Sequence, residues 1–426
     1  MPNRSKRPKI YSLDNIQLPE IQQYTLANGL PLWVINQGTQ AVLKMEVLFA
    51  AGRPYEKKAL ASRLTAELLK EGSQNYSAGQ IAEAMDFYGS SLKTPVDMDC
   101  PSIVLYTLNK HFEKVLPIVS DLLLQPSFPQ AEMDQFIDRQ IRRMEVELTK
   151  SDVVAYRTVT EEIFGRQHPY GYNSSEQTYR DLRRADIIQH FTNCYHADNG
   201  LVILSGLVTQ REIDLIRQYL GKLPKREKIL RPVIEFPSSS PSSLFIEDAD
   251  AAQTAYRLGI NLFPRGHQDY GDVFVLNTIL GGYFGSRLMT NIREDKGYTY
   301  NINSSLDCMR YGGCWLIGSE VNNAFIQETK EEIHKEIENL QTELMEEEEL
   351  EMVKSYLAGV LLGMLDGPFN ISEIAKNNYI AQTPINTFEQ VLKTLQNIDA
   401  HRIQNLFKQY LPMDQLSEVW VGPKKP

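Results

Sequence analysis

The chain has 426 residues, of which 42% are hydrophobic and 23% charged, and its formal net charge is -10. At roughly 100–200 residues per domain, this length predicts two to four domains with substantial buried cores. The net negative charge argues against a nucleic-acid-binding protein, because such proteins carry a patch of basic side chains.

The first half of the sequence predicts strands followed by helices. Residues 1–20 contain three prolines and are expected to form an N-terminal arm. An Asn-Gly turn separates two strand-like runs within residues 24–35. Ser77 is a candidate N-cap for a short helix. The remaining strands are predicted at 42–49, 91–95, 102–108 and 200–205, and the helices at 59–71, 77–88, 111–124, 129–150, 154–164 and 187–195.

A basic stretch and a Pro/Ser run at residues 222–243 predict a linker. After it the order of elements repeats, with strands at 255–263, 298–307, 313–320 and 417–422, and helices at 270–280, 286–294, 325–340, 346–365, 371–380 and 398–410. We therefore expect an arm (1–20), an N-terminal domain (21–221), a linker (222–243) and a homologous C-terminal domain (244–426). The separation of strands from helices favours an α+β class, with each domain a mostly antiparallel sheet covered by helices.

Targeting and redox signals are sparse. The basic N-terminus is followed by no apolar run of signal-peptide length, and no stretch approaches a membrane-spanning helix. The expected location is cytoplasmic, without membrane association. The four cysteines are expected to be reduced and mostly buried thiols, because four in so long a chain do not suggest a disulfide framework.

One long segment carries a family resemblance. Leu280-Gly-Gly-Tyr-Phe-Gly-Ser-Arg-Leu-Met-Thr-Asn-Ile-Arg-Glu-Asp-Lys-Gly-Tyr-Thr-Tyr300 resembles the C-terminal-half signature of the pitrilysin/insulinase peptidases, or inverzincins. Shorter matches agree in order: Leu26-Ala-Asn-Gly-Leu30, Lys70-Glu-Gly-Ser73 and His168-Pro-Tyr-Gly171. The resemblance covers residues 20–425 and implies two tandem domains that form half of a clam-like chamber.

The zinc motif of active family members is missing. These members carry H-x-x-E-H on a helix, with two His ligands and a Glu that acts as general base. The corresponding positions here hold Arg63, Ala66 and Glu67, and none of the seven histidines begins such a motif. Arg cannot donate a lone pair to a metal, although it could pair with Glu67 one helical turn away.

The third zinc ligand of the family implies a carboxylate near position 144, where Glu145 and Glu147 are the nearest. Both are more simply read as solvated charges, because one carboxylate without its His partners holds zinc poorly. We therefore expect no metal or other cofactor in this chain, and zinc in a partner subunit.

The resemblance assigns Arg293 and Tyr300 a role in catalysis. The matching residues of active members reach into the cleft and stabilise the charge that develops on the carbonyl oxygen of the scissile peptide. The alternatives are a helix-end salt bridge of Arg293 with Glu294 or Asp295, and simple strand packing for Tyr300.

These observations favour a zinc-less subunit that supplies Arg293 and Tyr300 to the site of a homologous, H-x-x-E-H-bearing partner acting on unfolded peptides. It would resemble the inactive partners of two-subunit zinc peptidases and of mitochondrial processing peptidase. One alternative is an inert scaffold or peptide-binding protein, as in the core subunits of a respiratory complex. A self-sufficient zinc peptidase is the third reading, and the sequence leaves open whether the isolated chain forms a homodimer.

Overall fold

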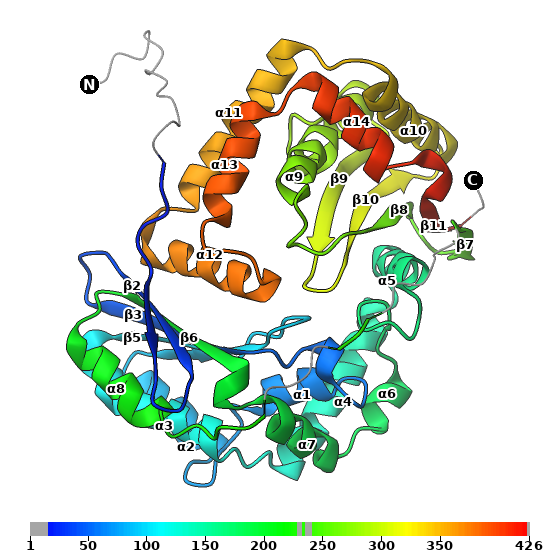
Figure 1. Cartoon of the computed structure of the whole chain (residues 1–426). Helices are drawn as coiled ribbons and strands as arrows, with labels where there is room; N and C mark the ends of the chain where they lie inside the picture. The colour runs from blue at the N-terminus through cyan, green and yellow to red at the C-terminus, as the bar shows by residue number, and fades with distance from the viewer. Residues whose placement is uncertain (1–15, 228–231, 235–240, 424–426) are drawn as a thin grey trace, which may run out of the picture.

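The computed structural model describes residues 16–227, 232–234 and 241–423. The expected arm at 1–15 and linker at 228–231 and 235–240 lie outside these residues. Two sheets, each covered by helices, occupy the lower and upper parts of Figure 1. The α+β class with two mostly antiparallel sheets is confirmed.

The first sheet has six strands in the order β1-β2-β6-β3-β5-β4, and only the β2–β6 pair is parallel. The strands are β1 (Gln22–Thr25), β2 (Pro31–Asn36), β3 (Val42–Phe49), β4 (Ser91–Lys93), β5 (Ser102–Leu108) and β6 (Gly200–Gly206). The second sheet has five strands in the order β7-β11-β8-β10-β9, and only β7–β11 is parallel. These are β7 (Ser243–Glu247), β8 (Gln253–Leu262), β9 (Thr299–Cys308), β10 (Gly313–Asn322) and β11 (Ser417–Gly422).

The two sheets share one topology. Apart from the additional edge strand β1, replacing β2, β3, β4, β5 and β6 by β7, β8, β9, β10 and β11 converts the first strand order into the second, with the single parallel pair in the same place. The internal repeat that the order of predicted elements suggested is therefore present in the strand pairing.

Helices of the first half are α1 (Ala61–Leu68), α2 (Ala78–Phe87), α3 (Asn109–Leu124), α4 (Gln130–Glu147), α5 (Ser151–Phe164), α6 (Glu176–Arg180), α7 (Arg184–Cys194) and α8 (Gln210–Leu220). Those of the second are α9 (Tyr270–Asn277), α10 (Ile326–Thr342), α11 (Glu347–Gly363), α12 (Gly367–Ala381), α13 (Thr387–Asn397) and α14 (Ala400–Tyr410). Two π-helical turns, η3 (Thr278–Gly282) and η4 (Met289–Asp295), flank the loop of the family signature.

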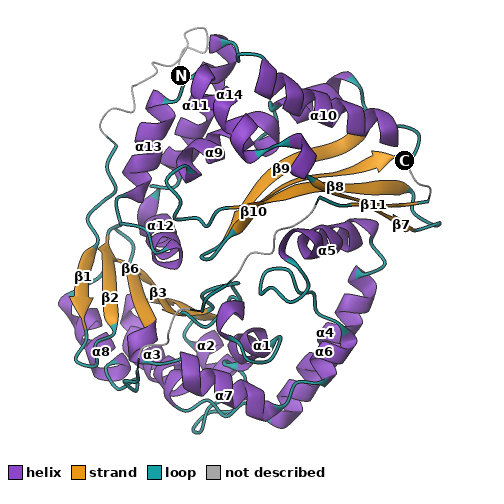
Figure 2. Cartoon of the chain, turned by 45° about the vertical axis from the view of Figure 1, so that its right-hand side comes forward, coloured by secondary structure: helices purple, strands orange, loops and turns teal. Residues whose placement is uncertain are grey.

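One helix of each half packs on the sheet of the other half. α5 packs on β8 and β11 of the second sheet, whereas α12 packs on β2 and β6 of the first. Figures 1 and 2 show α12 against the first sheet and α5 beneath the second. Because successive side chains of a strand point to opposite faces, one face of each sheet meets its own helices and the other meets the exchanged helix.

A charged pair anchors each exchanged helix. Lys44 of β3 is almost fully buried and pairs with Glu373 of α12, and also with Glu46 at 2.9 Å. At the related place in the second half, Arg257 of β8 pairs with Asp152 of α5. The exchange is therefore fixed by opposite charges as well as by apolar packing.

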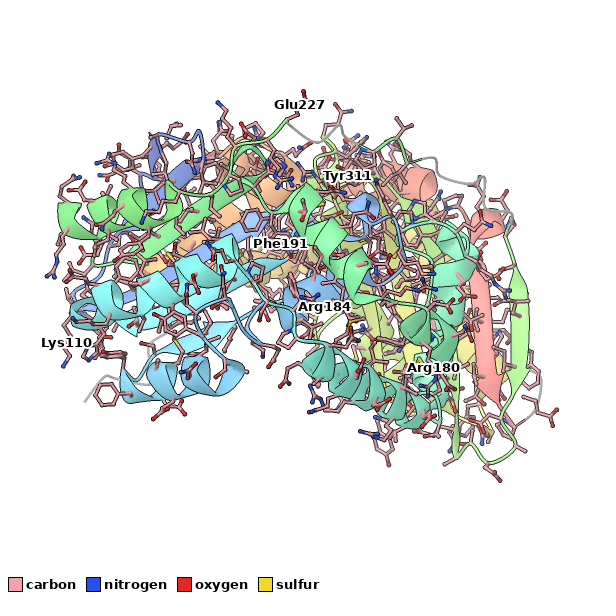
Figure 3. All side chains as sticks on the ribbon, turned by 90° about the horizontal axis from the view of Figure 1, so that it is seen from below. Lys110, Arg180, Arg184, Phe191, Glu227 and Tyr311 are labelled. Atoms are coloured by element: carbon pink, nitrogen blue, oxygen red, sulfur yellow. The ribbon has the colours of Figure 1, made fainter. Side chains whose placement is uncertain are left out.

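The tip of the β9–β10 hairpin forms a second junction between the halves. Arg310 donates its backbone N–H to the Asp99 carboxylate (2.8 Å), and the hydroxyls of Tyr55 and Tyr311 lie 2.5 Å apart. Figure 3 shows Tyr311 in the upper part of the view, between the left and right halves of the molecule. Burial raises the pKa of Asp99 to about 6, although the Tyr170 hydroxyl and the Arg310 N–H, both donating to its carboxylate, oppose the shift.

Several predicted details need correction. The predicted helix at 59–71 is shorter and ends at Leu68, and the one at 286–294 is largely the π-helical η4. Elements α6, α8, α13 and β7 were not predicted. Ser77 does cap α2, in a capping box with Gln80, and the four cysteines are free thiols, of which only Cys308 is partly exposed. No helix among the described residues is long and apolar enough to cross a membrane.

Candidate functional site

The positions that would carry the zinc motif lie on α1. Ala66 is buried, while Arg63 and Glu67 are partly exposed on the same side of the helix. The Arg63 guanidinium donates to the Gln140 side-chain oxygen of α4 at 3.2 Å. The Arg63–Glu67 ion pair that the spacing allowed does not occur among the described residues, because the Arg63 guanidinium donates to Gln140 instead.

The structure places no third ligand at this site. Position 144, where the resemblance implies a carboxylate, holds Met144, whose side chain belongs to the first-half core. Glu145 points to solvent, and Glu147 pairs with Arg143 at 2.8 Å. That exposed pair lowers the pKa of Glu147.

Zinc does not fit this set of side chains. Its protein ligands are thiolates, imidazoles and carboxylates, usually three or four around one ion. Of the three motif positions, Arg63 donates to the Gln140 amide and Ala66 has no ligand atom. Glu67 is therefore the only potential zinc ligand among them. In the part of the chain that the structure describes, no three His, Cys, Asp or Glu side chains are grouped to hold a metal.

Arg293 and Tyr300 lie together at the other candidate site. Arg293 lies in the last turn of η4, and Gly297, with φ +67°, turns the chain so that β9 runs back beside it. The Arg293 Nε–H donates to the Tyr300 carbonyl oxygen at 2.9 Å. Its guanidinium also lies 4.7 Å from the centre of the Phe284 ring. The cation is thus held by a backbone carbonyl and an aromatic face, and it also forms a long ion pair of 4.0 Å with Glu294, so the helix-end salt bridge considered above is present as well.

A β-bulge turns Tyr300 outward. β9 is an edge strand, and its pairing with β10 shifts register so that Tyr300 and Asn301 together oppose Glu320. The Thr299 hydroxyl stabilises this shape by donating to the Glu320 carbonyl at 2.6 Å. Bulges at sheet edges commonly re-aim a side chain. The Tyr300 side chain is 87% exposed as a result, so strand packing does not account for it.

A cavity of about 520 Å³ opens beside the pair. Its lining combines Phe284, Arg293 and Tyr300 with the polar side chains of Gln253, Glu294 and Asn322. A cation, a phenol hydroxyl and amides converge on a space large enough for a peptide side chain. The arrangement has the donors that an oxyanion requires, and the carboxylate in its lining, Glu294, lies 4.0 Å from the Arg293 guanidinium.

The two candidate sites of the chain do not meet. Tyr300 stands near the start of β9, whereas the hairpin tip that touches the first half lies at the far end of that strand, roughly 30 Å away at 3.3 Å per residue. Within the described residues, no hydrogen bond or ion pair links Arg293 or Tyr300 to α1 or α4. Phe284 and Gln140, which hold the two arginines, were not singled out from the sequence, because only the fold brings them close.

Comparisons with known proteins agree with this picture. Residues 181–357 match the family model described as Peptidase M16 inactive domain. The uncharacterized zinc protease YmxG of Bacillus subtilis is 22% identical over 402 residues, which are 92% of this chain and 96% of that protein. The non-peptidase homolog YmxG of Helicobacter pylori is 20% identical over 377 residues, 85% of this chain and 84% of that one.

Two further likenesses bear on subunit structure and fold. Subunit alpha-1 of the mitochondrial-processing peptidase of Dictyostelium discoideum is 23% identical over 233 residues, 52% of this chain and 35% of that protein. The crystal structure of a peptidase M16 inactive domain from Pseudomonas fluorescens has a TM-score of 0.86 at 22% identity, covering 95% of this chain and 100% of that chain. Residues 181–357 of the chain are therefore similar to the peptidase M16 inactive domain, and the resemblance to the pitrilysin/insulinase-like peptidases is confirmed.

Proposed function

We propose that this chain is the zinc-less subunit of a two-subunit peptidase and supplies Arg293 and Tyr300 to the zinc site of an H-x-x-E-H-bearing partner. One observation carries the proposal: the donor pair is intact beside a cavity, with Tyr300 exposed and Arg293 half-buried, while α1 of the same chain has lost its ligands. A subunit with donors and no metal needs a second chain to complete a site. The likeness to a non-peptidase homolog and to a processing-peptidase subunit supports the same reading.

In the proposed complex each group has a defined task. The partner's zinc would bind and activate the attacking water. Arg293 would offer its guanidinium N–H groups, and Tyr300 its hydroxyl, to the oxygen of the scissile carbonyl as negative charge develops there. Donors fixed in advance at such an oxygen stabilise the transition state more than the ground state. Phe284 and the Tyr300 carbonyl position the guanidinium for this contact.

The test combines the purified chain with the H-x-x-E-H-bearing homologue of the same organism and measures hydrolysis of an unstructured fluorogenic peptide. Arg293→Ala and Tyr300→Phe are each expected to lower kcat by about 10²–10³-fold, the usual cost of removing one oxyanion donor. Their KM should change little, because the lost contact belongs to the transition state. Arg142→Ala, at an exposed arginine of α4, is the matched control and should leave kcat unchanged.

Equal hydrolysis by the partner alone would contradict the proposal, as would full activity of the complex with Arg293→Ala. Either result would favour the inert scaffold instead. Cleavage by this chain alone, with one equivalent of bound zinc measured by mass spectrometry, would establish a self-sufficient peptidase and overturn the assignment.

A further inference from the structure

The outer face of α11 is apolar and partly exposed. Met352, Tyr356 and Val360 recur every four residues, so they form one stripe along the helix. Their side chains are 53%, 41% and 38% exposed, whereas the opposite side of α11 packs on α9 and α13. Gly359 and Gly363 lie in the exposed turns beside this stripe, and space is open above both. We call the stripe of Met352, Tyr356 and Val360, together with Phe284, the α11 face.

This face is continuous with the donor pair. The Tyr283 ring stacks on Tyr356 with 4.6 Å between ring centres, and the next residue is Phe284, which contacts Arg293. Arg287 makes two hydrogen bonds with Glu349, at 2.9 and 2.8 Å, and so fixes the signature loop to the start of α11. Ring contacts of Tyr283 and Phe284 therefore connect α11 to Arg293, the place that a partner's zinc site must approach.

Negative charge borders the α11 face at one end. Glu347, Glu348 and Glu351 occupy the first turns of α11, next to Met352. Glu351 pairs with Lys354 at 3.2 Å, but neither Glu347 nor Glu348 forms an ion pair with any residue that the structure describes. Two uncompensated carboxylates beside exposed apolar side chains complement a surface with an apolar centre and lysines or arginines at its rim.

Resting on the proposed function, we infer that the α11 face is the docking surface for the H-x-x-E-H-bearing partner, which presents an apolar centre with a basic rim to it. A peptide held at the partner's zinc reaches Arg293 and Tyr300 only if the two chains touch close to this pair. The α11 face adjoins the pair and has the apolar core and charged margin of a specific interface. Docking there sets the donors against the partner's site.

The test measures the dissociation constant of the complex with the purified partner. Met352→Glu together with Val360→Glu places charge in the centre of the face and leaves the Tyr283–Tyr356 stack intact. We expect binding at least about tenfold weaker, as for the loss of central apolar contacts in an interface. Phe87→Glu, at an 80% exposed aromatic residue on α2, is the matched control and should bind as the unmodified chain does. Circular dichroism of each variant checks that it is folded.

A second variant tests the charged margin. Glu347→Lys with Glu348→Lys should slow association and remove most of the loss of affinity that rising salt causes in the unmodified complex. Both side chains lie on the helix surface, so the fold should tolerate the change.

Failure of this inference differs from failure of the proposed function. At saturating partner, Met352→Glu/Val360→Glu should recover full kcat, whereas Arg293→Ala should stay slow at any partner concentration. If the Met352→Glu/Val360→Glu variant binds the partner with unchanged affinity, the α11 face is not the docking surface, and the proposed function is unaffected. If the variant instead converts a dimer of this chain into monomers, the occupant is a second copy and the inference is wrong.

Discussion

Replacing Lys44 by methionine should destabilise the contact between the two halves strongly. The Lys44 ammonium group is 2% exposed, pairs with Glu46 and Glu373, and donates to the Ser372 hydroxyl at 3.0 Å. Burial lowers the pKa of Lys44, but the two carboxylates outweigh it and raise the pKa above its ordinary value. The interactions of the ammonium group thus exceed its desolvation cost, and methionine would leave Glu46 buried without its closest cation.

The expected loss is about 3 kcal/mol of unfolding free energy, the lower end of the cost of breaking a buried ion pair. The lower end applies because Glu46 keeps the Ser102 hydroxyl as donor at 2.8 Å and Lys376 at 3.5 Å. Adding Glu46→Gln removes the stranded charge and keeps an acceptor for Ser102. The double variant should therefore regain at least about half of the loss.

Urea unfolding followed by tryptophan fluorescence measures this effect. Trp33 of β2 lies 6.1 Å from the Tyr379 ring of α12, so its emission reports on the docking of the exchanged helix. Lys114→Met, at an exposed lysine of α3, should change stability by no more than about 0.5 kcal/mol. A loss below about 1 kcal/mol for Lys44→Met, or a double variant as unstable as the single one, would refute the reasoning.

Three further changes have calculable outcomes. The pKa of Asp99 rises from 3.8 to about 6 on folding, so the folded state binds this proton more tightly, and the carboxyl stabilises the protein increasingly as pH falls from about 7 to 4. In urea titrations, the free energy of unfolding of the unmodified chain should therefore gain up to roughly 3 kcal/mol on that of the Asp99→Asn variant as pH falls over this range. A difference between the two proteins that does not change with pH would contradict this expectation. Ser77→Ala removes the cap of α2 and should cost about 1 kcal/mol by the same assay, while a neutral result would mean that the capping box is not formed. Gly52→Ala would place a methyl group 2.0 Å from the Met98 carbonyl oxygen and should lower the melting temperature markedly, and an unshifted melting curve would show that this backbone can move apart.

Local patterns allowed most strands and helices to be predicted, and the failures have particular causes. The strand at 42–49 is visible in the sequence because Leu43, Met45 and Val47 alternate toward one core. The same alternation places Lys44 and Glu46 on the other face, where a sequence alone suggests solvent. They are buried only because α12 arrives from residues more than 300 positions later.

The candidate site was predictable in its residue types and not in its geometry. The spacing of Arg293 and Tyr300 within the family signature identified the pair. The outward turn of Tyr300 depends on a bulge opposite Glu320, and the partner of Arg63 is an amide on another helix. The π-helical turns around the signature loop have no recognised sequence pattern, whereas α8 and α13 carried an apolar spacing that could have been used, as in Ile213, Ile216 and Leu220.

The exchange of α5 and α12 has a consequence for how the chain folds. α5 leaves the ribosome early, but the strands that bury its apolar face include β11, which follows much later in the sequence. One face of the first sheet likewise stays uncovered until α12 has been synthesised and packs on it. The first half cannot complete its core before α12 is made, nor the second half before β11 is made, so contacts between distant residues must form late, and such contacts slow folding. The nascent chain therefore presents uncovered apolar surface for most of its synthesis, and its yield in the cell should depend on chaperones that shield that surface.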